Sequence, residues 1–427
     1  MAKRFFGVRL RLRAGLWLVA AGAALCAVPL ALAQESLLNA PEPTHALRER
    51  ALPDQLAEKP SQPPAFKVSV EPLGFSAPGA NYLGQRNSLV SLDFLDENRL
   101  LFTFRVPGLI RRDADANEER QIRAVVLTLP EGTVEAEALW TVHDRERYLW
   151  MLNDGRFLLR DRDNLELGDA TLELKPFLRF PGPLLWLEMD PAQQFLVTDS
   201  REVAAEEEKP GESDFAVRVL RRDSGKVMLV SRSRSTVHLP INSDGYLESL
   251  RAMGDEWLLN LKYFNGGSTI LGQVESTCSP LFDFLSQREV LVTTCTPLGA
   301  GKLVAMRTDG RRLWEAQTSD ATVWPLVVRA PNGLRLAREA LAVTHPVSGR
   351  SPLSQDEIKG QLVEVLDAAD GRVALEASAS PILDAGGNVA ISPSGRRVAV
   401  LNGGAIQVFE LPPPPPLLEP AAHTPGH

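Results

Sequence analysis

Side chains that commonly perform chemistry are sparse in this chain and lie far apart along it. Three of the six histidines fall near the two ends, and the other three, His143, His238 and His345, are about 100 positions apart. No HExxH or CxxC motif is present, and no two histidines have the i, i+4 spacing of a zinc-binding helix. We therefore predict no metal site, no cofactor and no catalytic residue.

Carboxylates are more numerous, yet none forms a recognisable catalytic pair. Asp93 and Glu188 fall near apolar segments that could line a cleft, where two carboxylates would serve as acid and base. A run of alternating polar residues resembles a calcium-binding loop, but it lacks the central glycine and the terminal bidentate glutamate of that motif. Its members are Asp113, Asp115, Asn117 and Glu119. A solvated loop is the simpler interpretation of that run.

Two cysteines, Cys278 and Cys295, flank a predicted hairpin formed by residues 281–292. If the turn of that hairpin centres on Gln287 and Arg288, both cysteines fall on one face, within reach of a disulfide bond. A predicted export signal begins the chain, and an exported protein meets an oxidising compartment. We predict a Cys278–Cys295 disulfide, with two buried thiols as the alternative.

The elements that must carry these residues repeat seven times along the chain. Each repeat is an apolar strand, a short polar turn and a second apolar strand, at a mean spacing of about 50 residues. Turns such as Asp-Pro, Pro-Asn-Gly and Pro-Ser-Gly fix the backbone angles that a hairpin needs. The seven hairpins are residues 89–104, 149–159, 184–197, 246–261, 281–292, 323–336 and 389–401. This pattern predicts an all-β fold, a seven-bladed β-propeller with four-stranded antiparallel blades.

A second strand pair follows several of these hairpins, most clearly at residues 217–229, 302–314 and 361–375. With the blade that ends in Thr308-Asp-Gly-Arg-Arg-Leu-Trp314, the chain resembles the exported WD40-like and quinoprotein-like propellers of bacteria over about residues 66–411. Quinoprotein enzymes of that superfamily hold their cofactor against a vicinal cysteine pair, and this chain has no adjacent cysteines. The resemblance therefore implies the fold and leaves the activity open.

The last blade has only three strands of its own, at residues 389–392, 398–401 and 406–411. We predict that the N-terminal run Phe66–Val70 supplies the fourth strand. Such a closure would join the two ends of the ring and remove an exposed sheet edge.

The N-terminus has the three parts of a secretory signal. A basic start is followed by the apolar run 14–32 and by Ala31-Leu32-Ala33, a small-residue cleavage site. We predict a signal peptide at residues 1–33 and a periplasmic or extracellular location, with an uncleaved membrane anchor as the alternative. Residues 34–65 form a predicted disordered Pro-rich stem, and residues 412–427 a predicted disordered Pro-rich tail.

Charge limits the partners of the mature chain. Residues 1–33 carry five positive charges and no acid, so their removal changes the formal net charge from −8 to −13. A strongly acidic protein is a poor partner for nucleic acid and for anionic membrane surfaces. We predict a monomer that binds neither nucleic acid nor membrane, and that has no membrane span once the signal is removed.

Three long polar inserts indicate where a partner would bind. Residues 111–120, 199–214 and 346–359 each fall between the second and third predicted strands of a blade, and so on one face of the disc. The middle insert carries seven negative and two positive charges. We predict that Glu206, Glu207 and Glu208 contact a basic or cation-bearing partner, with a solvated charge run as the alternative.

Two functional hypotheses of different class follow. The first is a non-catalytic scaffold that binds a protein or peptide through loops on one face. The second is an enzyme or cofactor-binding propeller of the quinoprotein-like kind, which uses its central channel. The side chains that line the channel discriminate between them, because three or more convergent carboxylates, arginines or histidines would favour catalysis.

Overall fold

The structure is a computed structural model, and it describes residues 61–77, 89–108, 111–113, 118–143, 147–202, 215–234, 236–296, 301–347, 353–383 and 386–416. The predicted signal peptide and most of the predicted stem and tail lie outside the described residues. No helix among the described residues is long and apolar enough to cross a membrane.

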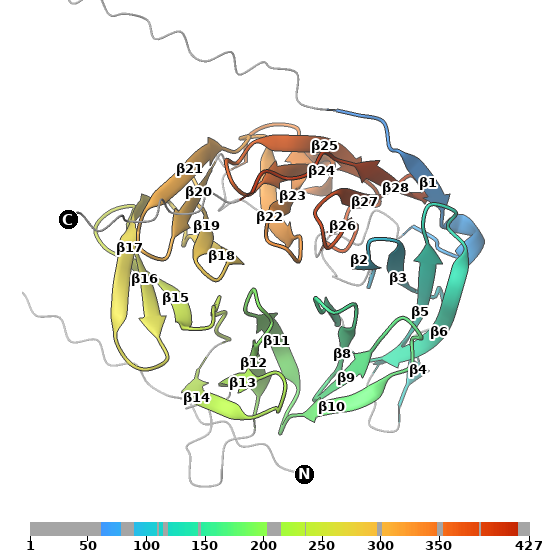
Figure 1. Ribbon diagram of the computed structural model, residues 1–427, viewed down its shortest axis with the longest axis horizontal. Coiled ribbons are helices and arrows are strands. Elements are labelled where there is room, and N and C mark those ends of the chain that lie inside the picture. The colour runs from blue at the N-terminus through green and yellow to red at the C-terminus, as the bar shows by residue number, and fades with distance from the viewer. Residues whose placement is uncertain are drawn as a thin grey trace, which may run out of the picture. The chain divides into compact units, whose positions relative to one another are not determined.

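Seven antiparallel sheets stand around a central axis as the blades of a propeller (Figure 1). Blade one consists of β2 (Ser91–Asp96), β3 (Arg99–Arg105), β5 (Glu118–Thr128) and β6 (Val134–Val142), with the short β4 (Arg111–Arg112) paired to β5. Blade two consists of β7 (Leu149–Met151), β8 (Phe157–Asp161), β9 (Asn164–Gly168) and β10 (Lys175–Arg179). Blade three consists of β11 (Leu184–Met189), β12 (Phe195–Arg201), β13 (Phe215–Arg221) and β14 (Val227–Ser233).

The remaining four blades complete the ring. Blade four consists of β15 (Gly245–Arg251), β16 (Glu256–Tyr263) and β17 (Ser268–Glu275), and blade five of β18 (Leu281–Ser286), β19 (Glu289–Thr293), β20 (Lys302–Arg307) and β21 (Arg312–Gln317). Blade six consists of β22 (Thr322–Arg329), β23 (Arg335–Val343), β24 (Ile358–Asp367) and β25 (Val373–Ala379). Blade seven consists of β26 (Val389–Ile391), β27 (Arg397–Asn402), β28 (Ala405–Glu410) and β1 (Phe66–Ser69). Among the described residues, two 3-10 helices, η1 (Glu71–Leu73) and η3 (Gln355–Glu357), lie outside the sheets.

Each hairpin predicted from the sequence forms the first two strands of a blade, so the seven-bladed fold is confirmed. The turn between β22 and β23 shows why its residues are needed. Asn332 accepts the backbone N–H of Leu334 at 2.9 Å, and Gly333 has the left-handed φ of +72°. A Cβ on Gly333 would lie 2.7 Å from the carbonyl oxygen of Leu285, so glycine also lets blade six approach blade five.

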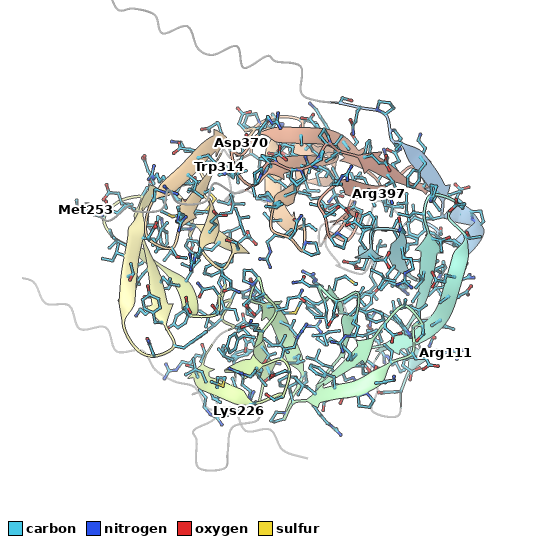
Figure 2. The ribbon with its side chains drawn as sticks, in the orientation of Figure 1. Arg111, Lys226, Met253, Trp314, Asp370 and Arg397 are labelled. Carbon is cyan, nitrogen blue, oxygen red and sulfur yellow. A yellow bond between two sulfur atoms is a disulfide. The ribbon has the colours of Figure 1, made fainter. Side chains whose placement is uncertain are left out.

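Apolar side chains fill the spaces between neighbouring blades. Figure 2 shows that the side chains leave an open centre. Between blades one and two, the rings of Trp140 and Phe157 lie 5.5 Å apart, and Phe157 is fully buried. Burial of a side chain of this size contributes roughly 2–3 kcal/mol. Because the faces of each sheet are used for this packing, the first strand of each blade is left to line the centre.

Blade four departs from the predicted set of four strands, because three strands pair in its sheet among the described residues. Only residues 276–280 separate β17 from β18, which is too short a segment to add an outer strand and return to the centre. The turn between β20 and β21 of blade five lies against β17 instead. There the Nη2 of Arg312 donates to the carbonyl oxygen of Gln273 at 2.9 Å.

The ring is closed by pairing between the two ends of the propeller, as predicted. Phe66 pairs with Val408 and Ser69 with Ala405. The backbone N–H of Val70 donates to Gly404 O at 3.1 Å, and the Val70 side chain is fully buried. A second contact between blades seven and one comes from Arg397, which is labelled in Figure 2. Its Nη1 donates to the carbonyl oxygen of Glu97 in blade one at 2.8 Å.

Cys278 and Cys295 lie together as a pair with disulfide geometry, with Cα atoms 5.6 Å apart and sulfur atoms 2.00 Å apart. The pairing of β18 with β19 places Leu281 opposite Thr293, one residue away from the predicted register. A bulge between Phe284 and Ser286 accounts for this shift. The pair ties the short connection after β17 to the end of β19.

We predict that opening the closure lowers stability. Val70→Ala removes two buried methyl groups beside the pairing of β1 with β28, at a cost of about 2 kcal/mol to the free energy of unfolding. Deleting residues 66–72 removes the whole strand and is expected to cost more. Urea unfolding followed by tryptophan fluorescence measures both. Lys67→Ala, an exposed position on the same strand, is the control, and an equal loss in this control would contradict the assignment.

We predict that the cysteine pair is oxidised in the exported protein. The bond spans a sequence separation of 17 residues, for which the chain-entropy model gives a stabilisation of about 3 kcal/mol. Mass spectrometry of a non-reduced digest should show the linked peptides, and reduction should lower the urea midpoint. Two freely alkylatable thiols in protein recovered from the exported fraction would contradict this prediction.

Candidate binding site in the central channel

The first strands of blades one to six, with the turn residue Pro393 of blade seven, line a cavity of about 990 Å³ along the propeller axis. At one edge the cavity reaches the turns that follow the first strands, including residues 191–193 and 331–333. Beside blades four and five it reaches the opposite edge, at residues 238–240 and 279–280. The cavity is therefore a channel with access from both faces of the disc.

Six carboxyl and guanidinium side chains line this channel, and one of them, Glu248 on β15, is paired with Lys262 at 3.1 Å. The other five come from five different blades. Three are carboxylates, Asp93 on β2, Glu188 on β11 and Asp283 on β18, and two are guanidinium groups, Arg147 just before β7 and Arg329 at the end of β22. Side chains alternate between the two faces of a strand. On β2, for example, Leu92 and Phe94 are buried between blades, and Asp93 between them is left to face the channel.

These five side chains form no direct ion pair with one another, although they lie close enough for their charges to interact. Asp93 accepts a hydrogen bond from the Ser91 hydroxyl at 2.6 Å, and the Nε of Arg147 donates to Leu149 O at 3.1 Å. The Nη1 of Arg329 donates to the carbonyl oxygen of Phe284. Within the described part of the chain, no ion pair joins any of the five to an opposite charge. Both signs of charge therefore stay accessible to water or to a ligand.

Position inside the ring shifts the protonation of the carboxyls. Burial raises the pKa of Glu188 to about 8, with a further rise from the negative charge of Asp283. Burial also raises the pKa values of Asp93 and Asp283 to about 6, against the opposing pull of Arg147 and Arg329 respectively. All three side chains are half-buried by area, because they face channel water although blades surround them. At neutral pH Glu188 thus carries a proton, and the two aspartates are mainly ionised.

Aromatic rings provide apolar wall between the charges. The guanidinium of Arg147 lies 5.3 Å from the ring centroid of Trp150, a distance at which a cation is attracted to the ring face. The ring of Trp186 lies 4.7 Å from that of His238. These contacts hold Arg147 and Trp186 in place at the channel surface.

Sequence reasoning identified part of this cluster. It named Asp93 and Glu188 near inner strands, but it found no carboxylate pair, and the structure corrects this by adding Asp283, Arg147 and Arg329. A signal was present in the repeat. Ser91-Leu-Asp-Phe-Leu95 and Leu281-Phe-Asp-Phe-Leu285 place an aspartate at the same position of two inner strands. Aligning the repeats on these segments would have found Asp283. The convergence of three or more carboxylates and arginines, the feature expected to favour catalysis, is observed.

The three predicted inserts do fall between the second and third strands of blades one, three and six. The pairing of Leu184 with Ser200 shows that the middle insert leaves the blade at the edge where β11 begins. Residues 199–201 belong to β12, and Glu206, Glu207 and Glu208 lie outside the described residues. Their predicted role in partner binding stays a prediction.

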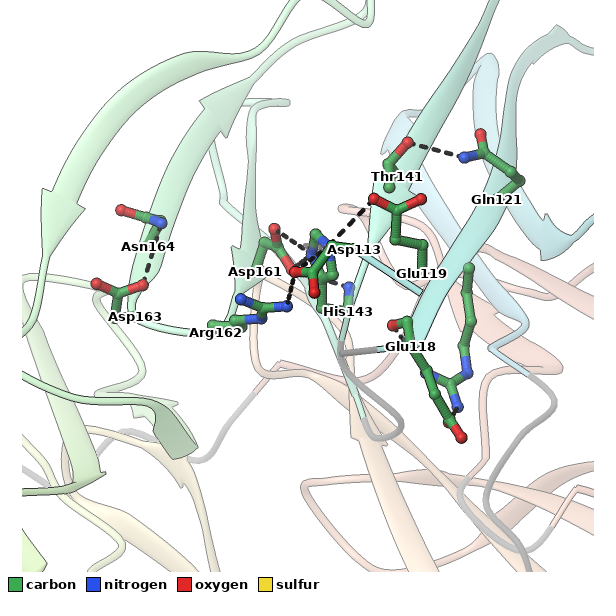
Figure 3. A network of polar contacts seen from close by, with 11 residues as sticks. Asp113, Glu118, Glu119, Gln121, Thr141, His143, Asp161, Arg162, Asp163 and Asn164 are labelled. Atoms are coloured by element: carbon green, nitrogen blue, oxygen red, sulfur yellow. Dashed lines mark hydrogen bonds and ion pairs between the residues drawn. The ribbon is translucent and has the colours of Figure 1, made fainter. Parts of the chain in front are cut away.

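His143 is not an isolated residue, as the sequence suggested, but the centre of an acidic cluster between blades one and two (Figure 3). Its Nδ1 lies 3.0 Å from Asp161, and its Nε2 lies 3.8 Å from Asp113 and 3.9 Å from Glu119. Arg162 donates to Asp113 at 2.7 Å. The described residues include no group of three or more His, Cys, Asp or Glu arranged to hold a metal ion. The cluster ties the insert of blade one to blade two.

No family model matches this chain, and no curated protein matches it. Among solved structures, it is similar to Sqt1 from Chaetomium thermophilum bound to the N-terminus of the ribosomal protein L10, with 11% identity, a TM-score of 0.43 and coverage of 81% of this chain and 99% of that one. It is also similar to Hsv2p from Kluyveromyces lactis, with 12% identity, a TM-score of 0.36 and coverage of 61% of this chain and 73% of that one. The acylaminoacyl peptidase of Pyrococcus horikoshii has 11% identity and a TM-score of 0.45, with coverage of 74% of this chain. This chain spans about half of the peptidase, 49% of its length. These similarities concern the fold alone and assign no activity.

Proposed function

We propose that this protein is an exported, non-catalytic binding scaffold that takes a cation-bearing protein or peptide segment into its central channel. One observation carries the proposal: five of the six carboxyl and guanidinium side chains that line a cavity of about 990 Å³ form no ion pair among the described residues. Charged groups held apart on rigid strands are arranged in advance for a partner that supplies the opposite charges.

A peptide matches this channel better than a small anion or cation does. Three carboxyls and two guanidinium groups of different blades are complementary to a segment that carries charges of both signs. The rings of Trp150 and Trp186 offer apolar surface between those charges. A cation beside Glu188 would favour its ionised form, which gives the channel three unpaired carboxylates against two guanidinium groups. Together with the acidic run Glu206–Glu208, this favours a segment with net positive charge.

Export is part of the same proposal. It rests on the predicted signal at residues 1–33 and is supported by the geometry of the Cys278–Cys295 pair, which suits an oxidising compartment. We propose a monomer in the periplasm or the extracellular space.

An acid–base enzyme is the second candidate, and one observation favours it. Neighbouring carboxyls with separated pKa values are the usual sign of an acid and a base, and Glu188 at about 8 and Asp283 at about 6 form such a pair. Turnover of a bound peptide, lost in Glu188→Gln, would favour this candidate over the scaffold.

We predict that the channel carboxyls determine peptide affinity. The probe is a library of ten-residue peptides sorted by net charge, with binding measured by fluorescence polarisation. Peptides with lysine or arginine should bind, and the Glu188→Gln, Asp283→Asn double variant should weaken them at least tenfold, equivalent to about 1.4 kcal/mol. Glu131→Gln, an exposed position far from the channel lining, is the control.

A comparison variant separates the channel from the insert. Replacing Glu206, Glu207 and Glu208 with glutamine should reduce affinity mainly at low salt, because salt screens the attraction between charges that are not in direct contact. If this triple variant abolishes binding while the channel variant binds like the wild type, the channel is not the site.

We predict a pH dependence of stability to which Glu188 contributes. Its pKa is raised in the folded protein, so the folded state binds its proton more tightly than the unfolded chain does. The contribution of this group to stability is therefore full below pH 4.5 and falls as pH rises to about 8. Glu188→Gln should flatten the decline of the melting temperature between pH 5 and 8. Parallel curves for wild type and variant would contradict the assigned protonation.

A further inference from the structure

A second, smaller cavity of about 150 Å³ adjoins the channel where blades one, two, six and seven meet its wall. Asp93 and Arg147 line both cavities, so the two are neighbours. The walls of the small cavity are otherwise mainly apolar, and they include Leu92, Leu149 and residues 326–328. A volume of this order accommodates a molecule of about six heavy atoms, such as benzene.

One carboxyl in this cavity has no partner. Glu339, on β23, lies one strand behind the channel-lining β22, and its side chain is 1% exposed. Neither of its carboxyl oxygens has a hydrogen-bond partner among the described residues. Buried polar groups are almost always hydrogen-bonded, and an unpaired one is costly. The adjacent Arg338, by contrast, is bonded to Glu364 and to Thr322.

Two glycines keep the space in front of Glu339 open. Gly386 and Gly387 both have left-handed φ angles, +70° and +103°. A Cβ on Gly386 would lie 3.3 Å from Oε2 of Glu339 and 2.9 Å from Leu326, and one on Gly387 would lie 2.1 Å from the Val90 carbonyl oxygen. Larger residues at these positions would press into the cavity wall.

We propose that this cavity is a subsite for an alkylammonium group, occupied by a lysine side chain of the bound peptide. Its aliphatic stem would pack against the apolar walls, and its ammonium group would donate hydrogen bonds to the carboxylate of Glu339. This inference rests on the proposed function for the source of the lysine, but not for the chemistry of the cavity.

The charges around the cavity are consistent with a cation. Arg147 is the one cation among the residues that line the cavity, and the nearby Asp93 offsets its charge, so Glu339 is the carboxyl left to meet a bound cation. Burial alone raises the pKa of Glu339 to about 8. An ammonium group beside it would favour the ionised form, so binding at pH 7 should release a proton from Glu339 to the buffer. A neutral ligand would release none.

The test is calorimetry of the full chain with n-butylammonium chloride as probe, in two buffers of different ionisation enthalpy at pH 7. We expect binding with release of close to one proton. Glu339→Gln, which keeps the shape of the side chain, should weaken the probe at least tenfold and abolish the proton release. Gly386→Ala should weaken it by narrowing the cavity. Glu131→Gln is the control, and melting temperatures verify that each variant folds.

Several results would overturn the proposal. The first is an absence of butylammonium binding to the wild type. The second is unchanged butylammonium binding to Glu339→Gln, which would mean that the cavity holds water and not the probe. The third is binding of neutral n-butanol as tight as that of butylammonium. A library peptide that binds through the channel but is unaffected by Glu339→Gln would remove the subsite and leave the proposed function standing. Butylammonium binding without any peptide binding would leave the subsite standing and remove the proposed function.

Two further peptides identify the source of the ammonium group. Acetylating the N-terminus of a bound peptide should leave its affinity unchanged, and replacing its lysine with norleucine should lower it to that seen with Glu339→Gln. Loss of binding on acetylation alone would assign the cavity to a terminal amine and overturn the lysine assignment.

Discussion

The pairing of β1 with β28 is the interaction on which the rest of the structure depends. Without it, blade seven would have three strands, and the ring would meet itself only through side chains. The backbone hydrogen bonds of residues 66–70 and the hydrogen bond from Arg397 to Glu97 fix the angle between the last and first blades. Closure at this seam brings side chains more than 200 residues apart, such as Asp93 and Arg329, to one channel.

Closure also explains why the channel charges stay unpaired. Each of the five is carried by a different blade, and each blade is held by apolar packing against its neighbours. The inner strands cannot shift to form ion pairs without breaking that packing. The ring therefore maintains a partly desolvated set of opposite charges, and the raised pKa of Glu188 is a consequence. A ligand that supplies matching charges would relieve this cost.

Turn chemistry and alternation made most of the fold predictable. Pro-Asn-Gly and Pro-Ser-Gly turns mark hairpins wherever they lie, and a missing strand in blade seven pointed directly to residues 66–70. The three strands of blade four were missed because the short connection 276–280 carries no local signal of its own. Asp283 was missed because, in one strand taken alone, a single charged residue looks the same whether it faces solvent or a channel, and only alignment of the inner strands reveals its match with Asp93. Glu339 could not have been found, since its burial depends on blade seven and on two glycines far along the chain.

The central claim is that a cation-bearing segment sits among the channel carboxyls. The most direct measurement is the titration of the Glu188 carboxyl by carbon-13 NMR, with and without a saturating lysine-containing peptide. In the free protein its pKa should be about 8. A cation in the channel should lower this value toward the usual range of a glutamate. An unchanged Glu188 titration in a protein that still binds the peptide would place the binding site elsewhere and contradict the account.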